Sequence, residues 1–136
     1  MIIATTMTRL RSWLPTLLFV AFAIFIALVI RAANTGQGER YWSFLDAIPL
    51  GDKLGHVILM GILCFLLNLA LHCRTVTLRK RPILLGTLLV SLFVIAEEIS
   101  QLFLQYRSFD LGDLLADAIG IALASSLAVL LSHRTP

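Results

Sequence analysis

The sequence predicts an all-α integral membrane protein, folded as a bundle of four transmembrane helices. Of its 136 residues, 59% are hydrophobic and only 14% are charged, whereas a soluble domain carries about 25% charged residues. The mean hydropathy is +0.93. Four apolar stretches approach the roughly 20 residues that a membrane-spanning helix needs. They occupy residues 10–31, 52–72, 83–104 and 112–132 and leave no room for a separate soluble module, so we expect one domain over 1–136.

The first predicted helix contains the apolar run Leu14–Ile30, which no charge interrupts. A basic start before an apolar run is also typical of a cleaved signal peptide, but this run is long for a signal and favours a retained helix. The following connector, Ala32–Gly51, contains the aromatic residues Tyr41, Trp42 and Phe44, which are typical of a membrane–water interface. Both a short interfacial helix and an ordinary loop are compatible with this connector.

The second predicted helix begins with charge at Asp52 and Lys53 and then becomes apolar. A basic loop without acidic residues, Cys73–Pro82, separates it from the third helix. The short turn Gln105–Gly112 leads into the fourth helix. The pI near 9.3 does not indicate nucleic-acid binding, because the basic residues flank apolar segments and form no patch.

The sequence contains no disulfide or cofactor signature. Cys64 and Cys73 are separated by roughly 13 Å of helix, which is too far for a disulfide. There is no CxxC pair, Gly-rich phosphate loop or HExxH motif. We therefore expect no disulfide and no cofactor.

The distribution of basic residues predicts the orientation of the bundle. If both termini are cytoplasmic, that side holds seven basic residues and the outer side holds four. The positive-inside bias favours this N-in/C-in arrangement, which places the Cys73–Pro82 loop in the cytoplasm and all eight acidic residues on the outer half. The seven are Arg9, Arg11, Arg74, Arg79, Lys80, Arg81 and Arg134, and the four are Arg31, Arg40, Lys53 and Arg107.

Polar residues of three predicted helices fall at one depth in the outer half of the membrane. Glu97 lies roughly 21 Å along the third helix, and Asp117 lies roughly 6 Å from the outer end of the fourth. His56 lies at a similar depth on the second helix. Because lipid cannot satisfy such groups, we expect them to face the bundle interior. Helical spacing also places three sets of residues each on one helix face. These sets are Asp52 with His56; Glu97 and Glu98 with Gln101; and Asp113 with Asp117 and Gly120.

Each of these residues also has a simpler structural explanation. Asp110 could cap a helix, and Lys53 could be an interfacial lysine that extends its charge to the membrane surface. Arg107 could neutralise a neighbouring acid, and His56 could be a core residue with its hydrogen bonds satisfied. Gly120, with Ala116 and Ala124, could form a packing seam of small residues. These roles do not explain why two adjacent glutamates, a glutamine, a histidine and two deep aspartates are concentrated in so small a bundle.

The chain resembles the VanZ-like membrane protein family. The matching elements are Ile48-Pro49, DKLGH at 52–56, the E-x-x-Q of Glu98 to Gln101, and RSFDLGDLLADAIG at 107–120. The resemblance implies a small multi-spanning envelope protein of the bacterial inner (cytoplasmic) membrane. The founding member is associated with low-level resistance to the glycopeptide teicoplanin, which we do not expect to be this protein's own task. The family pattern usually has asparagine where this chain has Asp117.

The first functional hypothesis is an extracytoplasmic polar site that binds or modifies an envelope component, such as a lipid-linked glycan or a phospholipid headgroup. The catalytic candidates are His56, Glu98 and Asp113; the substrate-binding candidates are Lys53, Gln101, Arg107 and Asp110; and the supporting residues are Asp52, Glu97, Asp117 and Gly120. Buried acids and histidines of this kind are suited to general acid–base catalysis. A metal site would use His56, Glu98, Asp113 and Asp117, but one histidine among carboxylates is a weak zinc pattern, so we predict no metal.

The second hypothesis is non-enzymatic, and the sequence leaves open whether any reaction is catalysed. It is a membrane binding or partner module, or a proton-linked carrier, in which the polar network is mainly structural. The partners predicted are membrane lipids and a lipid-linked envelope intermediate, without nucleic acid. The sequence does not determine the oligomeric state.

Overall fold

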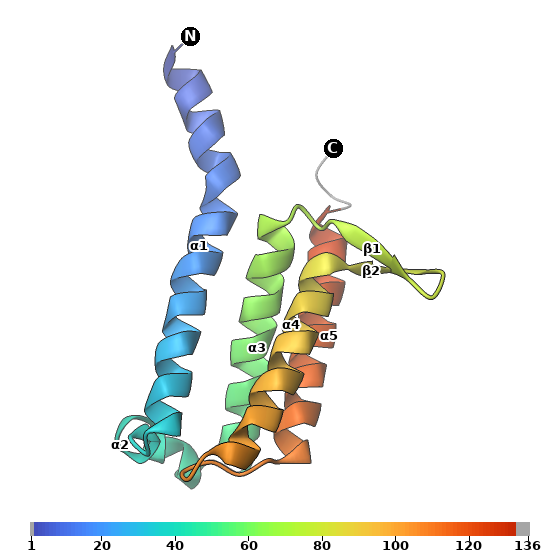
Figure 1. Ribbon diagram of the computed structural model, residues 1–136. Coiled ribbons are helices and arrows are strands. Elements are labelled where there is room, and N and C mark those ends of the chain that lie inside the picture. The colour runs from blue at the N-terminus through green and yellow to red at the C-terminus, as the bar shows by residue number, and fades with distance from the viewer. Residues whose placement is uncertain (1, 133–136) are drawn as a thin grey trace.

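A computed structural model describes residues 2–132. Its long helices, α1 (Ile2–Asn34), α3 (Gly51–Ala70), α4 (Leu85–Ser100) and α5 (Leu111–Ser132), stand side by side in Figure 1. Within the described residues, four helical stretches are long and apolar enough to cross a membrane. The predicted fold class, an all-α membrane protein with four spans, is therefore confirmed.

The observed helix bounds differ from the predicted bounds mainly at two places. Helix α1 begins at Ile2, well before the predicted residue 10. Helix α4 begins at Leu85 rather than at residue 83, and the 3-10 helix η2 (Gln101–Phe103) continues it. The connector after α1 is helical, with α2 (Gly38–Trp42) followed by the 3-10 helix η1 (Ser43–Ala47). The structure thus favours the short connecting helix over the loop.

The basic stretch that we expected to be a loop is a β-hairpin. Strand β1 (Thr75–Leu78) pairs antiparallel with β2 (Arg81–Leu84), with Val76 opposite Ile83. The alternating Thr-Val-Thr sequence of β1 suits a pleated strand, and Pro82 is tolerated because a two-stranded ribbon has free edges. Figure 1 shows the hairpin projecting sideways from the bundle, at the end opposite α2.

Helices α3 and α5 make the closest contact in the bundle. A Cβ atom added to Gly120 would lie 2.2 Å from the carbonyl oxygen of Val57, and one added to Gly61 would lie 3.2 Å from the carbonyl oxygen of Gly120. Ala116 and Ala124 are buried along the same side of α5. The predicted small-residue seam is therefore present, and it lets two backbones touch without bulky side chains between them.

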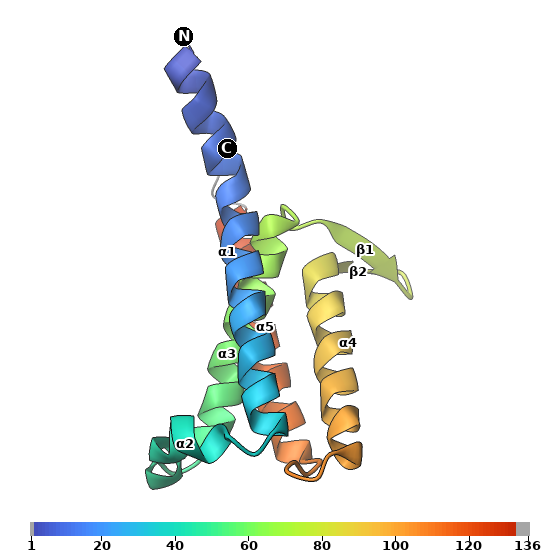
Figure 2. The same ribbon diagram turned by 60° about the vertical axis from the view of Figure 1, so that its left-hand side comes forward.

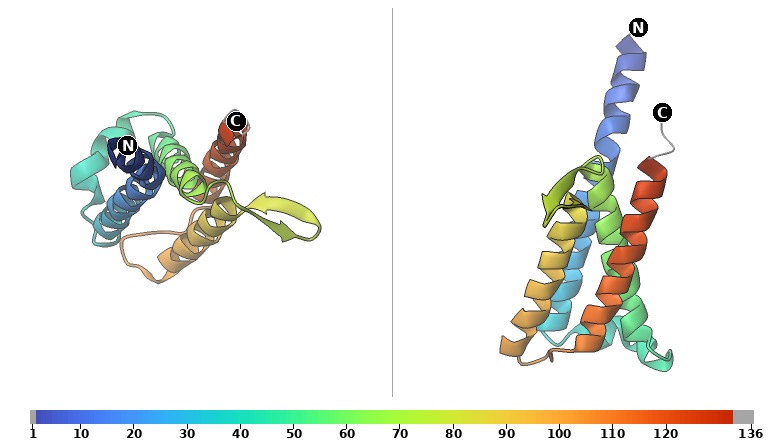
Figure 3. Two further views of the ribbon diagram at one scale, coloured as in Figure 1. Left: turned by 90° about the horizontal axis from the view of Figure 1, so that it is seen from above. Right: turned by 90° about the vertical axis from the view of Figure 1, so that its right-hand side faces the viewer.

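Helix α1 is less buried than the other three long helices. Only 6% of the most apolar 18-residue stretch of α1 is buried, whereas the corresponding stretch of α5 is 33% buried. Figures 1 and 2 show α1 leaning away from the other helices toward its N-terminus, and the view from above in Figure 3 shows α1 beside α3. The described residues Ile26, Met60, Val94 and Ile121 belong to one apolar core, to which α1 contributes near its C-terminal half.

A second polar cluster joins α3, α4 and α5 on the hairpin side of this core. The Asn68 side-chain amide donates to the Thr87 hydroxyl over 3.1 Å, and the hydroxyls of Thr87 and Ser125 are 2.6 Å apart. The buried thiol of Cys64 lies 3.4 Å from the same amide. Because Met60 lies between His56 and Cys64 on α3, an apolar layer separates this cluster from the acidic residues.

Candidate functional site

Lys53 binds three carboxylates where α3 and α5 begin. Its ammonium nitrogen lies 3.1 Å from Asp52 and also pairs with Asp110 and Asp113. Lys53 lies in the first turn of α3, Asp113 lies in the first turn of α5, and Asp110 immediately precedes that helix. This ammonium group is therefore already neutralised, which argues against its predicted role in holding an anionic ligand.

Asp110 both pairs with Lys53 and caps helix α5. The backbone N–H of Gly112 donates to its carboxylate over 2.7 Å, so the structural role predicted for Asp110 as a cap is present. The hydrogen bond from Lys53, followed by the one from Gly112, holds the pKa of the Asp110 carboxyl below its ordinary value. The charged form of Asp110 therefore stabilises the start of α5.

His56 lies between two carboxylates of α5. Its Nδ1 atom is 3.0 Å from Asp117 Oδ1, and its Nε2 atom is 3.6 Å from Asp113 Oδ2. Asp113 and Asp117 are one helical turn apart, which places both carboxylates on the side facing α3. Asp117 is only 3% exposed, so an unpaired charge there would be costly. The contact with His56 supplies its partner.

Glu98 and Gln101 tie the end of α4 to the turn before α5. One Glu98 oxygen accepts the backbone N–H of Asp110 over 2.6 Å, and the other accepts the Gln101 side-chain amide over 3.0 Å. The same amide donates to Glu97 over 2.8 Å. Glu98 and Gln101 are each 1% exposed. Both Glu98 oxygens are thus engaged in joining two helices.

Arg107 approaches this group from the loop between α4 and α5. Its Nε donates to Gln101 Oε1 over 3.3 Å, and its Nη2 lies 3.9 Å from Glu97 Oε1. That Glu97 oxygen is buried and has no hydrogen-bond partner in the described structure. An arginine has five N–H donors, so donors of Arg107 remain beside an acceptor without a partner.

These contacts connect the predicted polar layer. They link Lys53 and Asp113 to His56, Asp110 to Glu98, and Glu98 through Gln101 to Arg107, so the described polar residues of α3, α4 and α5 converge at one end of the bundle. Gly120 is not part of this network and instead lies in the α3–α5 seam. Among the side chains that the structure describes, no group of three or more histidine, cysteine, aspartate or glutamate residues could hold a metal ion.

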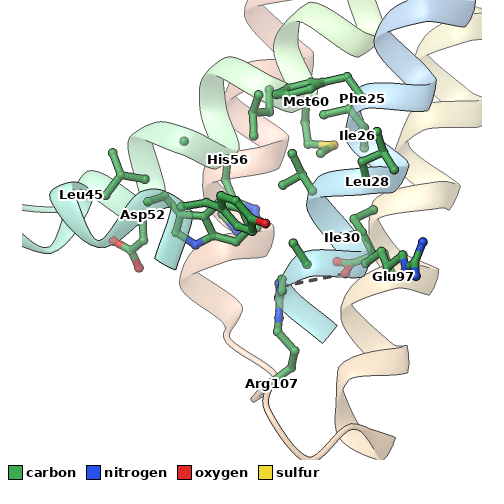
Figure 4. A pocket seen from close by; sticks show the side chains of 18 of the residues that line it. Phe25, Ile26, Leu28, Ile30, Leu45, Asp52, His56, Met60, Glu97 and Arg107 are labelled. Carbon is green, nitrogen blue, oxygen red and sulfur yellow. Dashed lines mark ion pairs between the residues drawn. The ribbon is translucent and has the colours of Figure 1, made fainter. Parts of the chain in front are cut away.

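A cavity of about 950 Å³ opens between α1, α3 and α4 beside this network. Its volume is in the range of small-molecule sites, about 300–1,000 Å³. Most of its wall is apolar, and Figure 4 shows Phe25, Ile26 and Met60 toward one end and Arg107 with Glu97 toward the other. The charged and imidazole side chains that line it are Arg31, Asp52, His56, Glu97, Arg107 and Asp117.

The cavity divides the predicted site residues into two groups. Its lining includes the predicted residues Asp52, His56, Glu97, Arg107 and Asp117. The lining does not include Lys53, Glu98, Gln101, Asp110, Asp113 and Gly120. The geometry therefore separates the predicted residues that line the cavity from those that do not, a distinction that spacing alone does not reveal.

The sequence analysis missed the contribution of α1 and α2 to this cavity. Arg31 follows the long apolar run of α1, and it lines the cavity together with Tyr41 and Trp42 of α2. The aromatic cluster was recognised, but only as an interface marker. The run Leu14–Ile30 is apolar on every side, so no periodicity indicated which side faces a cavity. A charge that ends such a run was the available signal.

The sequence can be compared with those of known proteins. The sequence model of the VanZ/LLP1 family matches residues 2–132, nearly the whole chain. An uncharacterized protein of Schizosaccharomyces pombe, C11E3.10, is 34% identical over 113 residues, which are 82% of this chain. The aligned region spans 64% of the yeast protein. No solved structure matches the chain.

Proposed function

The chain belongs to the VanZ/LLP1 family, and from the cavity between its helices we infer that it binds an amphiphilic membrane component, a lipid with a hydroxyl-bearing headgroup such as a lipid-linked glycan. The observation that carries this proposal is the division of one cavity into an apolar wall and a charged end. An amphiphile has the same division, with a tail that prefers the apolar wall and a polar head that needs hydrogen-bond partners.

The charges at the polar end favour hydroxyl groups over a strongly anionic headgroup. Arg31 and Arg107 line the cavity together with three acidic residues, Asp52, Glu97 and Asp117. A phosphate oxygen accepts hydrogen bonds and carries negative charge, so these acids would repel it. A hydroxyl both donates and accepts, so it can accept from Arg107 and donate to the carboxylate of Glu97, both of which line the cavity. The aromatic rings of Tyr41 and Trp42 add flat apolar surface beside these groups.

The low burial of α1 leaves a lipid a route into the cavity. One wall consists of α1 residues, including Phe25, Leu28 and Ile30, and this helix has little buried surface to hold it against the others. A lipid that diffuses in the bilayer would enter sideways with its tail still in an apolar environment. Entry from the bilayer avoids the cost of exposing the tail to water.

His56 is the group best placed for chemistry on a bound headgroup. It faces the cavity, and Asp117 holds its Nδ1 atom, as a carboxylate orients the imidazole of a general base. We assign Glu98 and Asp113 to the structural network, since neither lines the cavity. A proton-linked carrier is less well supported, because the core residues Met60, Val94 and Ile121 separate His56 from the polar cluster around Asn68.

We place the protein in the inner membrane of a bacterium, with the polar end of the cavity on the extracytoplasmic side. This orientation rests on the excess of basic residues at the hairpin end of the bundle. The ligand would then be a component of the outer leaflet.

Binding can be measured through Trp42, which lines the cavity. In a Trp13→Phe background, Trp42 is the remaining tryptophan of the chain. The purified full chain, held in a zwitterionic detergent so that no sugar headgroup competes, is titrated with monoglucosyl diacylglycerol or with phosphatidic acid of the same acyl chains. We expect a saturable change in Trp42 fluorescence with the glucosyl lipid and weaker binding of phosphatidic acid.

Variants identify the site. Glu97→Ala removes a carboxylate that lines the cavity and should weaken binding of the glucosyl lipid about tenfold, as loss of a hydrogen bond to a charged group does. Ser126→Ala, at an exposed position of α5, is the control and should bind like the parent protein. Equal or tighter binding of phosphatidic acid would mean that the ligand is an anionic phospholipid and not a lipid with a hydroxyl-bearing headgroup. No effect of Glu97→Ala would contradict the proposed site.

A further inference from the structure

The β-hairpin carries a concentration of positive charge that nothing in the described structure neutralises. Arg79, Lys80 and Arg81 occupy its tip, Arg74 precedes β1, and all four are exposed. Between Asp52 and Glu97 the sequence has no acidic residue. The ion pairs found among the side chains that the structure describes use other cations, namely Lys53, His56 and Arg107. The hairpin is therefore a basic element without an acidic partner in this part of the chain.

The turn of the hairpin places two of these charges where local geometry disfavours them. Leu78 and Arg81 close a two-residue turn, and both residues within it have positive φ, 49° for Arg79 and 67° for Lys80. Two-residue turns of this kind prefer Asn-Gly, because residues with larger side chains are strained at positive φ. Turn formation thus does not explain an Arg-Lys pair here, and such strain often marks a functional position.

The position and faces of the hairpin match the surface of a bilayer. It connects the end of α3 to the start of α4, both of which are long and apolar enough to cross the membrane. Figures 1 and 3 show that it projects sideways from the bundle, so it extends over the surrounding lipid. Because paired residues share a face, Val76, Leu78 and Ile83 lie on one side of the ribbon, together with Arg81 at its tip. An apolar side next to a basic tip suits an interfacial position.

We propose that the Thr75–Leu84 hairpin binds anionic phospholipid headgroups on the membrane surface where α3 ends. Its tip would attract the phosphate groups of neighbouring lipids, while Val76 and Ile83 rest against the upper part of the acyl chains. Basic residues near an anionic surface each strengthen binding about fivefold. A lipid surface fits better than an acidic protein, because the hairpin projects along the membrane and not away from it. This site is separate from the cavity at the other end of the bundle.

The test uses the full chain in nanodiscs of phosphatidylcholine alone and in nanodiscs that contain about 30% phosphatidylglycerol. Hydrogen exchange is followed for the amides of residues 75–84. If the two turn residues bind anionic lipid, their contacts must break before the hairpin opens. Exchange should then be about 25-fold slower in the anionic nanodiscs than in the neutral ones, and added salt should reduce this ratio.

A charge-free variant with a favourable turn separates lipid binding from folding of the hairpin. The double substitution Arg79→Asn and Lys80→Gly introduces the preferred turn sequence and removes both charges. The hairpin should stay folded in both kinds of nanodisc, while the ratio of exchange rates falls by about 25-fold. Arg40→Gln removes one charge in α2, at the opposite end of the bundle, and should leave the ratio unchanged.

Two results would overturn the proposal. The first is equal exchange in neutral and anionic nanodiscs, which is also the result expected if the hairpin binds an acidic protein. The second is a lipid-dependent ratio that is as large in the double variant as in the parent protein. Neither result bears on ligand binding in the cavity, which the Trp42 titration measures separately.

Discussion

His56 Nδ1 lies 3.0 Å from Asp117 Oδ1, and this contact joins α3 to α5 at the polar end of the cavity. Asp117 is nearly fully buried, so its carboxylate requires a hydrogen-bond partner. The His56 imidazole in turn requires an acceptor. Asparagine can supply an acceptor at the same place without a charge. The asparagine that the family usually has at position 117 would therefore preserve the contact between α3 and α5.

We predict that Asp117→Asn is tolerated and that Asp117→Ala is not. The asparagine variant should unfold with a free energy within about 1 kcal/mol of the parent protein, and the alanine variant should lose about 1–3 kcal/mol, because His56 is left without its acceptor. Denaturant unfolding in detergent micelles measures both. If both variants lose equal stability, the carboxylate charge matters and the shape of the acceptor does not.

Glu98→Gln distinguishes a structural carboxylate from a catalytic one. A glutamine oxygen can still accept the Asp110 backbone N–H, but its amide would face the Gln101 amide, donor against donor. We expect a loss of about 1–2 kcal/mol in the free energy of unfolding. Lipid binding, measured by Trp42 fluorescence per folded molecule, should not change. A variant with unchanged stability and abolished activity would return Glu98 to the catalytic group.

The ion pair of Asp110 predicts a stability loss in acid. The pKa of Asp110 is lowered from its ordinary value of 3.8, first by the hydrogen bond from Lys53, so folding favours its charged form. The resulting stability is fully present above pH 3.8 and is lost as the pH falls through the lower folded-state pKa. In Asp110→Asn, which keeps a capping oxygen, this part of the acid dependence should be absent. The comparison requires unfolding curves of both proteins from about pH 6 to about pH 2.

The four spans and the convergence of the polar residues could be predicted from the sequence. Long apolar runs indicate membrane helices because the bilayer sets their length. Polar residues at helical spacing indicate the inward side of a membrane helix because lipid offers them no partner. His56, Glu98, Gln101, Arg107 and Asp113 come together for this reason. The small-residue seam around Gly120 follows from the same periodicity.

The sequence could not predict which of these residues line the cavity and which pair with one another, because this depends on how the helices tilt. Lys53 and Arg107 are both cations near acids in the sequence, yet Lys53 is held by three carboxylates, while Arg107 keeps donors toward the cavity. Nothing in the pattern of α1 indicated that Arg31 would line the same cavity. The hairpin was missed because its two-residue turn is Arg79-Lys80 and not the Asn-Gly that indicates such a turn, and because each strand has only four residues.

The predicted orientation can be tested at the tip of the hairpin. If both termini are cytoplasmic, the hairpin is cytoplasmic, and the loop that contains Arg107 is outside. A reporter enzyme that is active only outside the cytoplasm should then be inactive when fused after Thr77 and active when fused after Gln105. The reversed pattern would invert the proposed orientation and place the cavity's polar end in the cytoplasm.

Two glycines in different surroundings test the seam between α3 and α5. A Cβ atom at Gly120 would lie 2.2 Å from the backbone oxygen of Val57, which cannot move without shifting α3. Gly120→Ala should therefore cost at least the roughly 1–3 kcal/mol of an overpacked core. Gly55→Ala is the matched control within a helix, since its nearest neighbour would be 4.0 Å away.

Alanine has a higher helix propensity than glycine by about 1 kcal/mol, so Gly55→Ala should leave the stability unchanged or raise it. Thermal unfolding of the two variants in the same detergent gives the comparison. Because the shift at Gly120 would also move His56 relative to Asp117, Gly120→Ala should weaken lipid binding in the cavity beyond its effect on stability. Equal melting temperatures for the two variants would mean that α3 and α5 do not touch along this seam.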